Sequence, residues 1–161
     1  MVSLKNKKGF TIVELLIVIV VIGILATLVL VTFTGANQKG RNSQRQTDVN
    51  AVQSHVETFY AQHGFYPTLA DLQTASFVST YMKGLDPDAL KDPKGPTTAI
   101  AATSDSDQYG YTATGTSPGC TNTTATTITA NEPEDNGCDG FSITATLEGK
   151  TPPDTFTRKS N

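Results

Sequence analysis

Glu14 stands near the start of an apolar segment, where a charged side chain is costly. It is the only charged residue in the 22-residue apolar run from Phe10 to Val31. A helix rises about 1.5 Å per residue, so the run spans roughly 33 Å, close to the hydrocarbon thickness of a bilayer. The run therefore predicts a membrane-spanning helix. A carboxylate costs about 2.5–3.5 kcal/mol at mid-membrane and less near an end. We therefore expect Glu14 to pair with a positive group.

The residues before the apolar run indicate its orientation. Lys5, Lys7 and Lys8 precede it, and no acidic residue does. Because positive charge is retained on the cytoplasmic side, the N-terminus is predicted to lie inside and the C-terminal bulk outside. A secretory signal peptide is the alternative, with Thr34-Gly35-Ala36 as a weak cleavage site. Its apolar region usually has about 7–15 residues, which is shorter than this run.

Composition narrows the functional classes. The chain has 161 residues, of which 12 are basic and 15 acidic, and 37% are hydrophobic. A net charge of −3 argues against a nucleic-acid binder driven by overall basicity. The length leaves no room for a large enzyme with a deep core. The sequence contains no phosphate loop, serine elbow or metal-binding helix motif, so we expect no catalytic residue, cofactor or metal.

Cys120 and Cys138 are the only cysteines, and the predicted topology places both outside the cytoplasm. We expect a disulfide between them, because such bonds persist in oxidising compartments. The cross-link would constrain the unfolded chain by roughly 3 kcal/mol. A metal site needs more ligands than two distant cysteines, and no histidine lies near them in the sequence.

The other polar candidates favour surface roles. The acidic stretch 132–139 offers oxygen atoms to Ca²⁺, but its spacing does not match an EF-hand loop, so we expect a solvated loop. His55 and His63 have no Cys, Ser or acidic pattern around them, and we expect them at the surface or an interface. Asn122-Thr-Thr124 matches an N-glycosylation sequon, although the Thr-rich region would equally suit O-linked sugars or none.

The start of the chain carries a specific motif. The segment Lys7-Lys8-Gly9-Phe10-Thr11-Ile12-Val13-Glu14-Leu15-Leu16 closely resembles the class III signal of type IV pilins and of secretion and competence pseudopilins. In that family a prepilin peptidase cuts after the glycine and methylates the new amine. The resemblance implies cleavage between Gly9 and Phe10 and N-methylation of Phe10. Many members carry a proline near the end of the apolar helix, whereas this chain has Val31 there.

Cleavage at this junction would supply a partner for Glu14. It removes three lysines, so the balance becomes 9 basic minus 15 acidic residues, or −6, before the new amine is counted. The Phe10 amine and Glu14 can pair within one chain or between neighbours. Pairing between neighbours would set the register of a polymer. It would also remove two charges that each cost several kcal/mol when unpaired in an apolar core.

A second, amphipathic part of the helix is predicted over residues 36–64. Its apolar positions recur on one side, at Val49, Val52, Val56, Phe59 and Tyr60. Gly64 supplies a C-cap. The basic cluster Lys39, Arg41 and Arg45 is expected to form a solvated or inter-subunit face.

A globular head is predicted over residues 65–148. Thr68 and Asp71 match a capping box that opens a short helix, with Leu69, Leu72 and Phe77 facing inward. Residues 91–95 form a turn. Strands are expected over 108–114, 124–130 and 141–147, in an antiparallel sheet laid on the helix. The tail, residues 149–161, is expected to be extended or disordered.

These observations predict an α+β protein. A leader, residues 1–9, precedes a long helix whose transmembrane part, 10–35, continues into the amphipathic part, which packs on a small antiparallel sheet head. We expect a non-enzymatic subunit of a type IV pilus-like filament. It would sit in the cytoplasmic membrane with its N-terminus inside before assembly, and in an extracellular pilus afterwards.

The resemblance also implies the partners. They are the prepilin peptidase/methyltransferase, identical or related pilin subunits and the assembly platform in the membrane; no direct nucleic-acid binding is predicted. The Thr-rich head favours a major pilin, whereas a major pseudopilin of a secretion or competence system is the alternative. From another class, the alternative is a membrane-anchored extracellular binding module.

Overall fold

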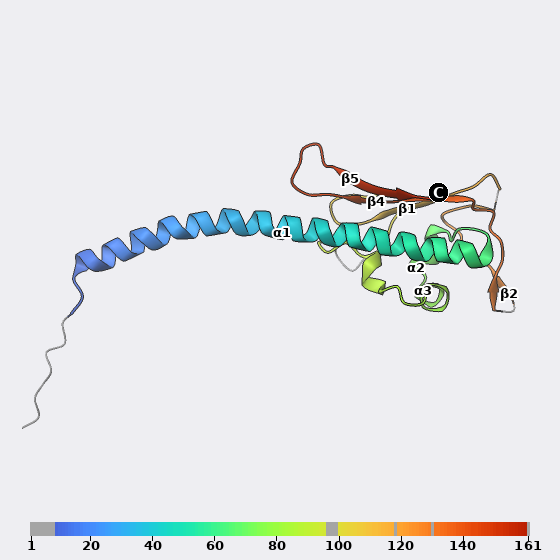
Figure 1. Cartoon of the computed structure of the whole chain (residues 1–161), viewed down its shortest axis with the longest axis horizontal. Coiled ribbons are helices and arrows are strands. Elements are labelled where there is room, and N and C mark those ends of the chain that lie inside the picture. Colours follow the sequence, from blue (N-terminus) through green and yellow to red (C-terminus); the bar gives the residue numbers. More distant parts are fainter. Residues whose placement is uncertain (1–8, 96–99, 118, 130, 161) are drawn as a thin grey trace, which may run out of the picture. The chain divides into compact units, whose positions relative to one another are not determined.

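The computed structural model describes residues 9–95, 100–117, 119–129 and 131–160, so the predicted leader lies outside the described residues except for Gly9. The chain divides into two compact units, with the boundary between Asn37 and Gln38. One helix, α1 (Ile12–His63), contributes to both units (Figure 1).

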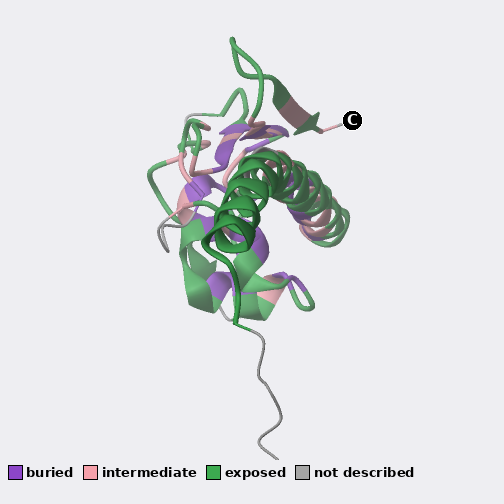
Figure 2. Cartoon of the chain, turned by 90° about the vertical axis from the view of Figure 1, so that its left-hand side faces the viewer, coloured by how far each residue is buried: buried purple, intermediate pink, exposed green. Residues whose placement is uncertain are grey.

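The first unit is built around the apolar part of α1. Its large apolar side chains from Phe10 to Phe33 are exposed wherever they are described (Figure 2). The helix is long and apolar enough to cross a membrane. The hydroxyl of Thr27 donates to the carbonyl of Ile24 at 2.8 Å, and that of Thr32 donates to Leu28 at 3.0 Å. Because hydrocarbon offers no acceptor, this internal pairing suits a lipid or protein core.

The second part of α1 supplies the core stripe of the second unit. Four of the five predicted positions are fully buried: Val49, Val52, Val56 and Phe59. The fifth apolar position, Tyr60, is not buried: its ring stacks on that of Tyr66, with centroids 4.3 Å apart, and the residue stays 39% exposed. Gly64 has a φ of 84°, and its amide donates to the carbonyl of Tyr60 at 2.8 Å, which confirms the C-cap.

Three short helices follow: α2 (Leu69–Gln73), α3 (Ala75–Tyr81) and the 3₁₀ helix η1 (Pro87–Leu90). The capping box is confirmed, since the Thr68 hydroxyl accepts from the Asp71 amide and Asp71 accepts from the Thr68 amide at 2.7 Å. Asp71 also accepts from the amide and hydroxyl of Thr126 at 2.6 and 2.5 Å. The box therefore fixes a distant loop as well as a helix start.

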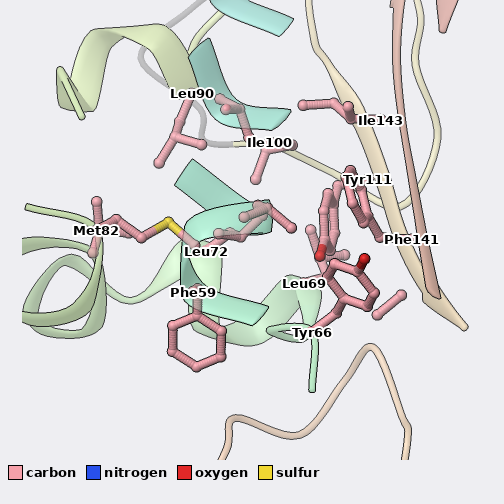
Figure 3. Packing of buried hydrophobic residues seen from close by; sticks show 14 of the residues in the cluster. Phe59, Tyr66, Leu69, Leu72, Met82, Leu90, Ile100, Tyr111, Phe141 and Ile143 are labelled. Atoms are coloured by element: carbon pink, nitrogen blue, oxygen red, sulfur yellow. The ribbon is translucent and has the colours of Figure 1, made fainter. Parts of the chain in front are cut away.

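The sheet contains β1 (Gly110–Thr114), β4 (Gly140–Thr146) and β5 (Thr155–Lys159), antiparallel in the order β1-β4-β5. It lies on one side of the second part of α1, and α2 and α3 lie on the other (Figure 1). Alternate residues of β4 enter the core, as a strand period of two requires. Figure 3 shows two of them, Phe141 and Ile143, in the same core as Phe59 and Leu72.

The third strand is not the one that the sequence pattern predicted. Segment 124–130 contributes only β2 (Ile128–Thr129), which pairs with β3 (Glu132–Pro133) in a separate hairpin. The tail, predicted to be extended or disordered, is extended over β5, which pairs with β4. Phe156 of β5 packs against the core, whereas both residues of β2 are exposed. Apolar burial therefore favours the tail as the sheet's third strand.

Arg41 and Arg45 do not form the solvated or inter-subunit face that we predicted. Arg45 is fully buried and bonds to both oxygens of Asp92, at 2.6 and 2.8 Å. Glu148 forms an ion pair with Arg45 at 2.8 Å and accepts hydrogen bonds from Arg41 at 2.8 and 2.6 Å. These bonds, first from Arg41 and then from Arg45, lower the pKa of Glu148 to about 2. Only Lys39 of the cluster is exposed.

A disulfide joins Cys120 and Cys138, as predicted. Cys138 is buried in the core, and its carbonyl accepts from the amide of Tyr66 at 2.9 Å. The disulfide therefore links the loop after β1 to the residues before β4, and the backbone hydrogen bond at Cys138 joins them to the segment that follows α1.

Reducing this disulfide should lower the free energy of unfolding by roughly 3 kcal/mol, because the unfolded loop regains conformational freedom. The melting temperature should fall by on the order of 10 °C, while the helical circular dichroism signal at room temperature persists. The double variant Cys120→Ser/Cys138→Ser, measured without reductant, should have the same melting temperature as the reduced wild type. An unchanged melting temperature in reductant would contradict this prediction.

Candidate processing and assembly site

The junction at Gly9 and Phe10 lies in non-helical backbone just before α1. Phe10 is 89% exposed. A Cβ atom added to Gly9 would meet no atom within 4 Å. The junction is therefore accessible, and packing within the described chain gives no reason for Gly9 to be small.

Glu14 forms a reciprocal hydrogen-bonding pattern with Thr11. The amide and hydroxyl of Thr11 donate to Oε2 of Glu14, at 2.8 and 2.7 Å. The amide of Glu14 donates to the Thr11 hydroxyl at 3.2 Å. This is a capping box, which satisfies amides that the first turn of a helix leaves without partners. The sequence-based reasoning missed the role of Thr11, although Thr-x-x-Glu before an apolar run is its signal.

The capping box holds the Glu14 carboxylate beside the predicted new N-terminus. Phe10 directly precedes Thr11, so cleavage after Gly9 would place the amine one residue from an amide that already donates to Glu14. Both bonds from Thr11 use Oε2, and Oε1 accepts no hydrogen bond from a described residue. Oε1 is therefore available to a second donor, such as the amine of a neighbouring chain.

The two histidines belong to the second unit. Nδ1 of His55 is 2.9 Å from the carbonyl of Ala51. His63 is partly buried beside Phe59, with ring centroids 4.4 Å apart, and its Nδ1 is 3.8 Å from Glu132. Among the described residues, no group of three His, Cys, Asp or Glu side chains is arranged to hold a metal.

The sequon at Asn122 is used structurally. Its Oδ1 accepts from the amide of Ala113 at 2.8 Å, and its Nδ2 donates to the carbonyl of the same residue at 3.1 Å. Asn122 thus pairs with β1 as a short strand would. Attaching a sugar to Nδ2 would disturb this pairing, so the structure does not present Asn122 as a free acceptor.

Residues 4–30 match the family model described as the prokaryotic N-terminal methylation motif. The chain is similar to competence protein ComGC of Bacillus subtilis, with 38% identity over 74 residues, 45% of this chain and 76% of that protein. It is also similar to the ComG operon protein 3 homolog of Bacillus licheniformis, with 30% identity over 91 residues, 56% of this chain and 94% of that protein. The chain belongs to the type IV pilin-like family.

A third relative of this type IV pilin-like chain is type II secretion system core protein G of Dickeya chrysanthemi. The two are 31% identical over 64 residues, which cover 40% of this chain and 42% of that protein. The chain spans less than half the length of the type II secretion core proteins that it matches. No solved structure matches it. The matched motif includes Gly9, Phe10 and Glu14, whose individual roles stay predictions.

Proposed function

We propose that the chain is the structural subunit of a type IV pilus-like filament. It polymerises through the apolar part of α1 after cleavage between Gly9 and Phe10 and N-methylation of Phe10. The observation that carries this proposal is the exposure of every described large apolar side chain from Phe10 to Phe33. Apolar surface of this extent needs a covering. Lipid covers it before assembly, and neighbouring copies cover it afterwards.

The charge on Glu14 favours a polymer over a simple anchor. A capping box works with Gln as well as Glu, so the cap alone does not require a carboxylate. A neutral Gln would also enter the membrane at lower cost. The carboxylate is explained when a positive amine binds it, and Oε1, which accepts no hydrogen bond from a described residue, allows this. A membrane-anchored binding module, the alternative from another class, leaves the charge without a use.

The proposed location and partners follow from this role. The unprocessed subunit spans the cytoplasmic membrane with its N-terminus inside, and the assembled subunit is extracellular. The prepilin peptidase/methyltransferase acts on Gly9 and Phe10. Identical or related subunits pack around α1, and a membrane platform assembles them. Mass spectrometry of the mature protein tests the processing step: we expect a methylated Phe10 as the first residue, whereas an unprocessed start would support the anchor.

Gly9→Val should block processing. Full-length precursor should accumulate in the membrane, and filaments should be absent. Because no described atom would contact the new Cβ within 4 Å, the effect would arise at the peptidase and not from misfolding. Gly40→Val is the matched control, since its Cβ is equally unobstructed, and it should be processed normally. Mature protein of normal length from Gly9→Val would count against the peptidase assignment.

The relatives favour a second candidate within the same class. They are named a competence protein and a type II secretion core protein, which supports a pseudopilin of such a system over a major pilin. Deleting the gene and measuring surface fibres, DNA uptake and protein export separates these candidates. Loss of abundant fibres alone would support the major pilin. Loss of uptake or export without loss of abundant fibres would support the pseudopilin.

A further inference from the structure

An apolar groove of about 390 Å³ lies on the second unit between α3 and η1. Its apolar lining comprises Leu72, Val78, Met82, Leu85, Pro87 and Leu90. All of these except Pro87 are buried core residues, and Figure 3 shows Leu72, Met82 and Leu90 among them. The groove therefore opens directly onto the core of an otherwise polar head. Such a surface is typical of a site that binds another apolar group.

The hairpin of β2 and β3 carries a complementary feature. Ile128 of β2 is 49% exposed. In the described part of the second unit, only Ile128 and Tyr60 are large apolar residues with exposure of this kind. The ring of Tyr60 already stacks on Tyr66. Ile128 is therefore the side chain of the head that gains most by burial in another molecule.

The charges beside the groove and on the hairpin are opposite. Lys83 and Lys91 line the groove. Lys83 forms no ion pair with any described residue, whereas Lys91 pairs with Asp88 at 2.8 Å. On the hairpin, the side chain of Glu132 is 77% exposed, and its contact with His63 is long, at 3.8 Å. Within one chain Lys83 and Glu132 line a common pocket but form no ion pair with each other. An acidic hairpin with an apolar side chain thus matches an apolar groove that has a lysine in its lining.

The two features lie at different levels along α1. Glu132 of the hairpin neighbours His63, at the end of α1. Gly84, which lines the groove, neighbours His55, since a Cβ on Gly84 would lie 3.8 Å from Nε2 of His55. Eight residues of helix separate these levels, or about 12 Å. When the second parts of α1 (residues 38–63) of two copies run parallel, the hairpin meets the groove of a copy displaced along that axis, and that copy cannot reciprocate. Contacts of this heterologous kind generate open filaments.

We propose that the groove binds the β2–β3 hairpin of a second copy, with Ile128 on the apolar floor and Glu132 near Lys83. The proposal rests on the filament function proposed above. It adds a contact between the globular heads of neighbouring copies, which is separate from the pairing at Phe10 and Glu14.

Cysteine cross-linking in intact filaments of the full chain tests the contact. Ser79 lines the groove and is exposed. Ser79→Cys combined with Ile128→Cys should give reductant-sensitive multimers in sheared filaments. Each single variant should not. The pair Lys159→Cys and Ile128→Cys is the matched control, because Lys159 is an exposed residue of β5 outside the groove, and it should not cross-link.

A substitution gives an independent measure. Ile128→Asp should lower filament yield on the order of tenfold, because it removes the apolar contact and adds like charge beside Glu132. Thr123→Asp, an exposed position in the same loop, should keep the wild-type yield.

The outcomes separate this contact from the function on which it rests. Filaments without the Ser79–Ile128 cross-link, or with full yield from Ile128→Asp, overturn the contact and leave the filament function intact. A cross-link from Ser79→Cys to a different protein overturns the second copy as the occupant. Absence of filaments from the wild-type chain overturns both proposals.

Discussion

Glu14→Leu is expected to reach the membrane at least as well as the wild type and yet to form almost no filaments. The substitution removes an intramembrane charge, which favours insertion. Processing should be largely retained, because the peptidase acts at the Gly9–Phe10 junction. The polymer core would then hold an amine without its carboxylate, at a cost of several kcal/mol. Filament yield should fall at least about tenfold, since each 1.4 kcal/mol is a factor of ten.

Two further variants separate the charge of Glu14 from its capping role. Glu14→Gln retains an acceptor for Thr11 but loses the charge. Like Glu14→Leu, it should therefore form almost no filaments. Thr11→Ala loses the side-chain cap but keeps the carboxylate, so it should assemble better than either. Filaments in sheared fractions are compared with processed subunit in the membrane. Abundant filaments of Glu14→Leu, at wild-type membrane levels, would defeat the pairing mechanism even though family membership stands.

The features that the sequence predicted correctly are local ones. The spacing of Val49, Val52, Val56 and Phe59 describes one face of a helix, and the structure buries all four. Thr68 and Asp71 are three residues apart and form their capping box. The turn at Asp92 closes when the amide of Gly95 donates to its carbonyl at 3.0 Å. Each pattern operates within about three helical turns or fewer, so its partners are already near one another in the sequence.

The features that the sequence did not reveal depend on distant partners. Asp92 lies 47 residues from Arg45, and Glu148 lies 107 residues from Arg41, so their charges look like separate surface clusters. The choice of β5 over segment 124–130 depends on Phe156, which packs against the core. At the candidate site, Gly9, Phe10 and Glu14 were identified by motif, but Thr11 was overlooked. Only the three-dimensional structure shows that both described hydrogen bonds to Glu14 use Oε2 and that none uses Oε1.

Arg45→Met is expected to destabilise the head by about 3–5 kcal/mol. Asp92 is 4% exposed, and the substitution would leave its carboxylate buried without the two bonds from Arg45. The melting temperature of the full chain in detergent should fall by on the order of 10 °C or more. Lys39→Met is the matched control, because Lys39 is exposed, and it should change stability by less than about 0.5 kcal/mol.

The double variant Arg45→Met/Asp92→Leu distinguishes an unpaired buried charge from lost packing. Replacing both partners with apolar residues removes the unpaired charge, so much of the lost stability should return.

The pH dependence of the wild type gives a second measure of the same network. The folded-state pKa of Glu148 is lowered from 4.5 to about 2, so its contribution is present above the ordinary pKa and is lost as pH falls toward 2. Glu148→Gln should flatten the stability curve in that window. If Arg45→Met were as stable as the wild type, the buried pair of Arg45 and Asp92 would not be holding the turn at Asp92 against α1.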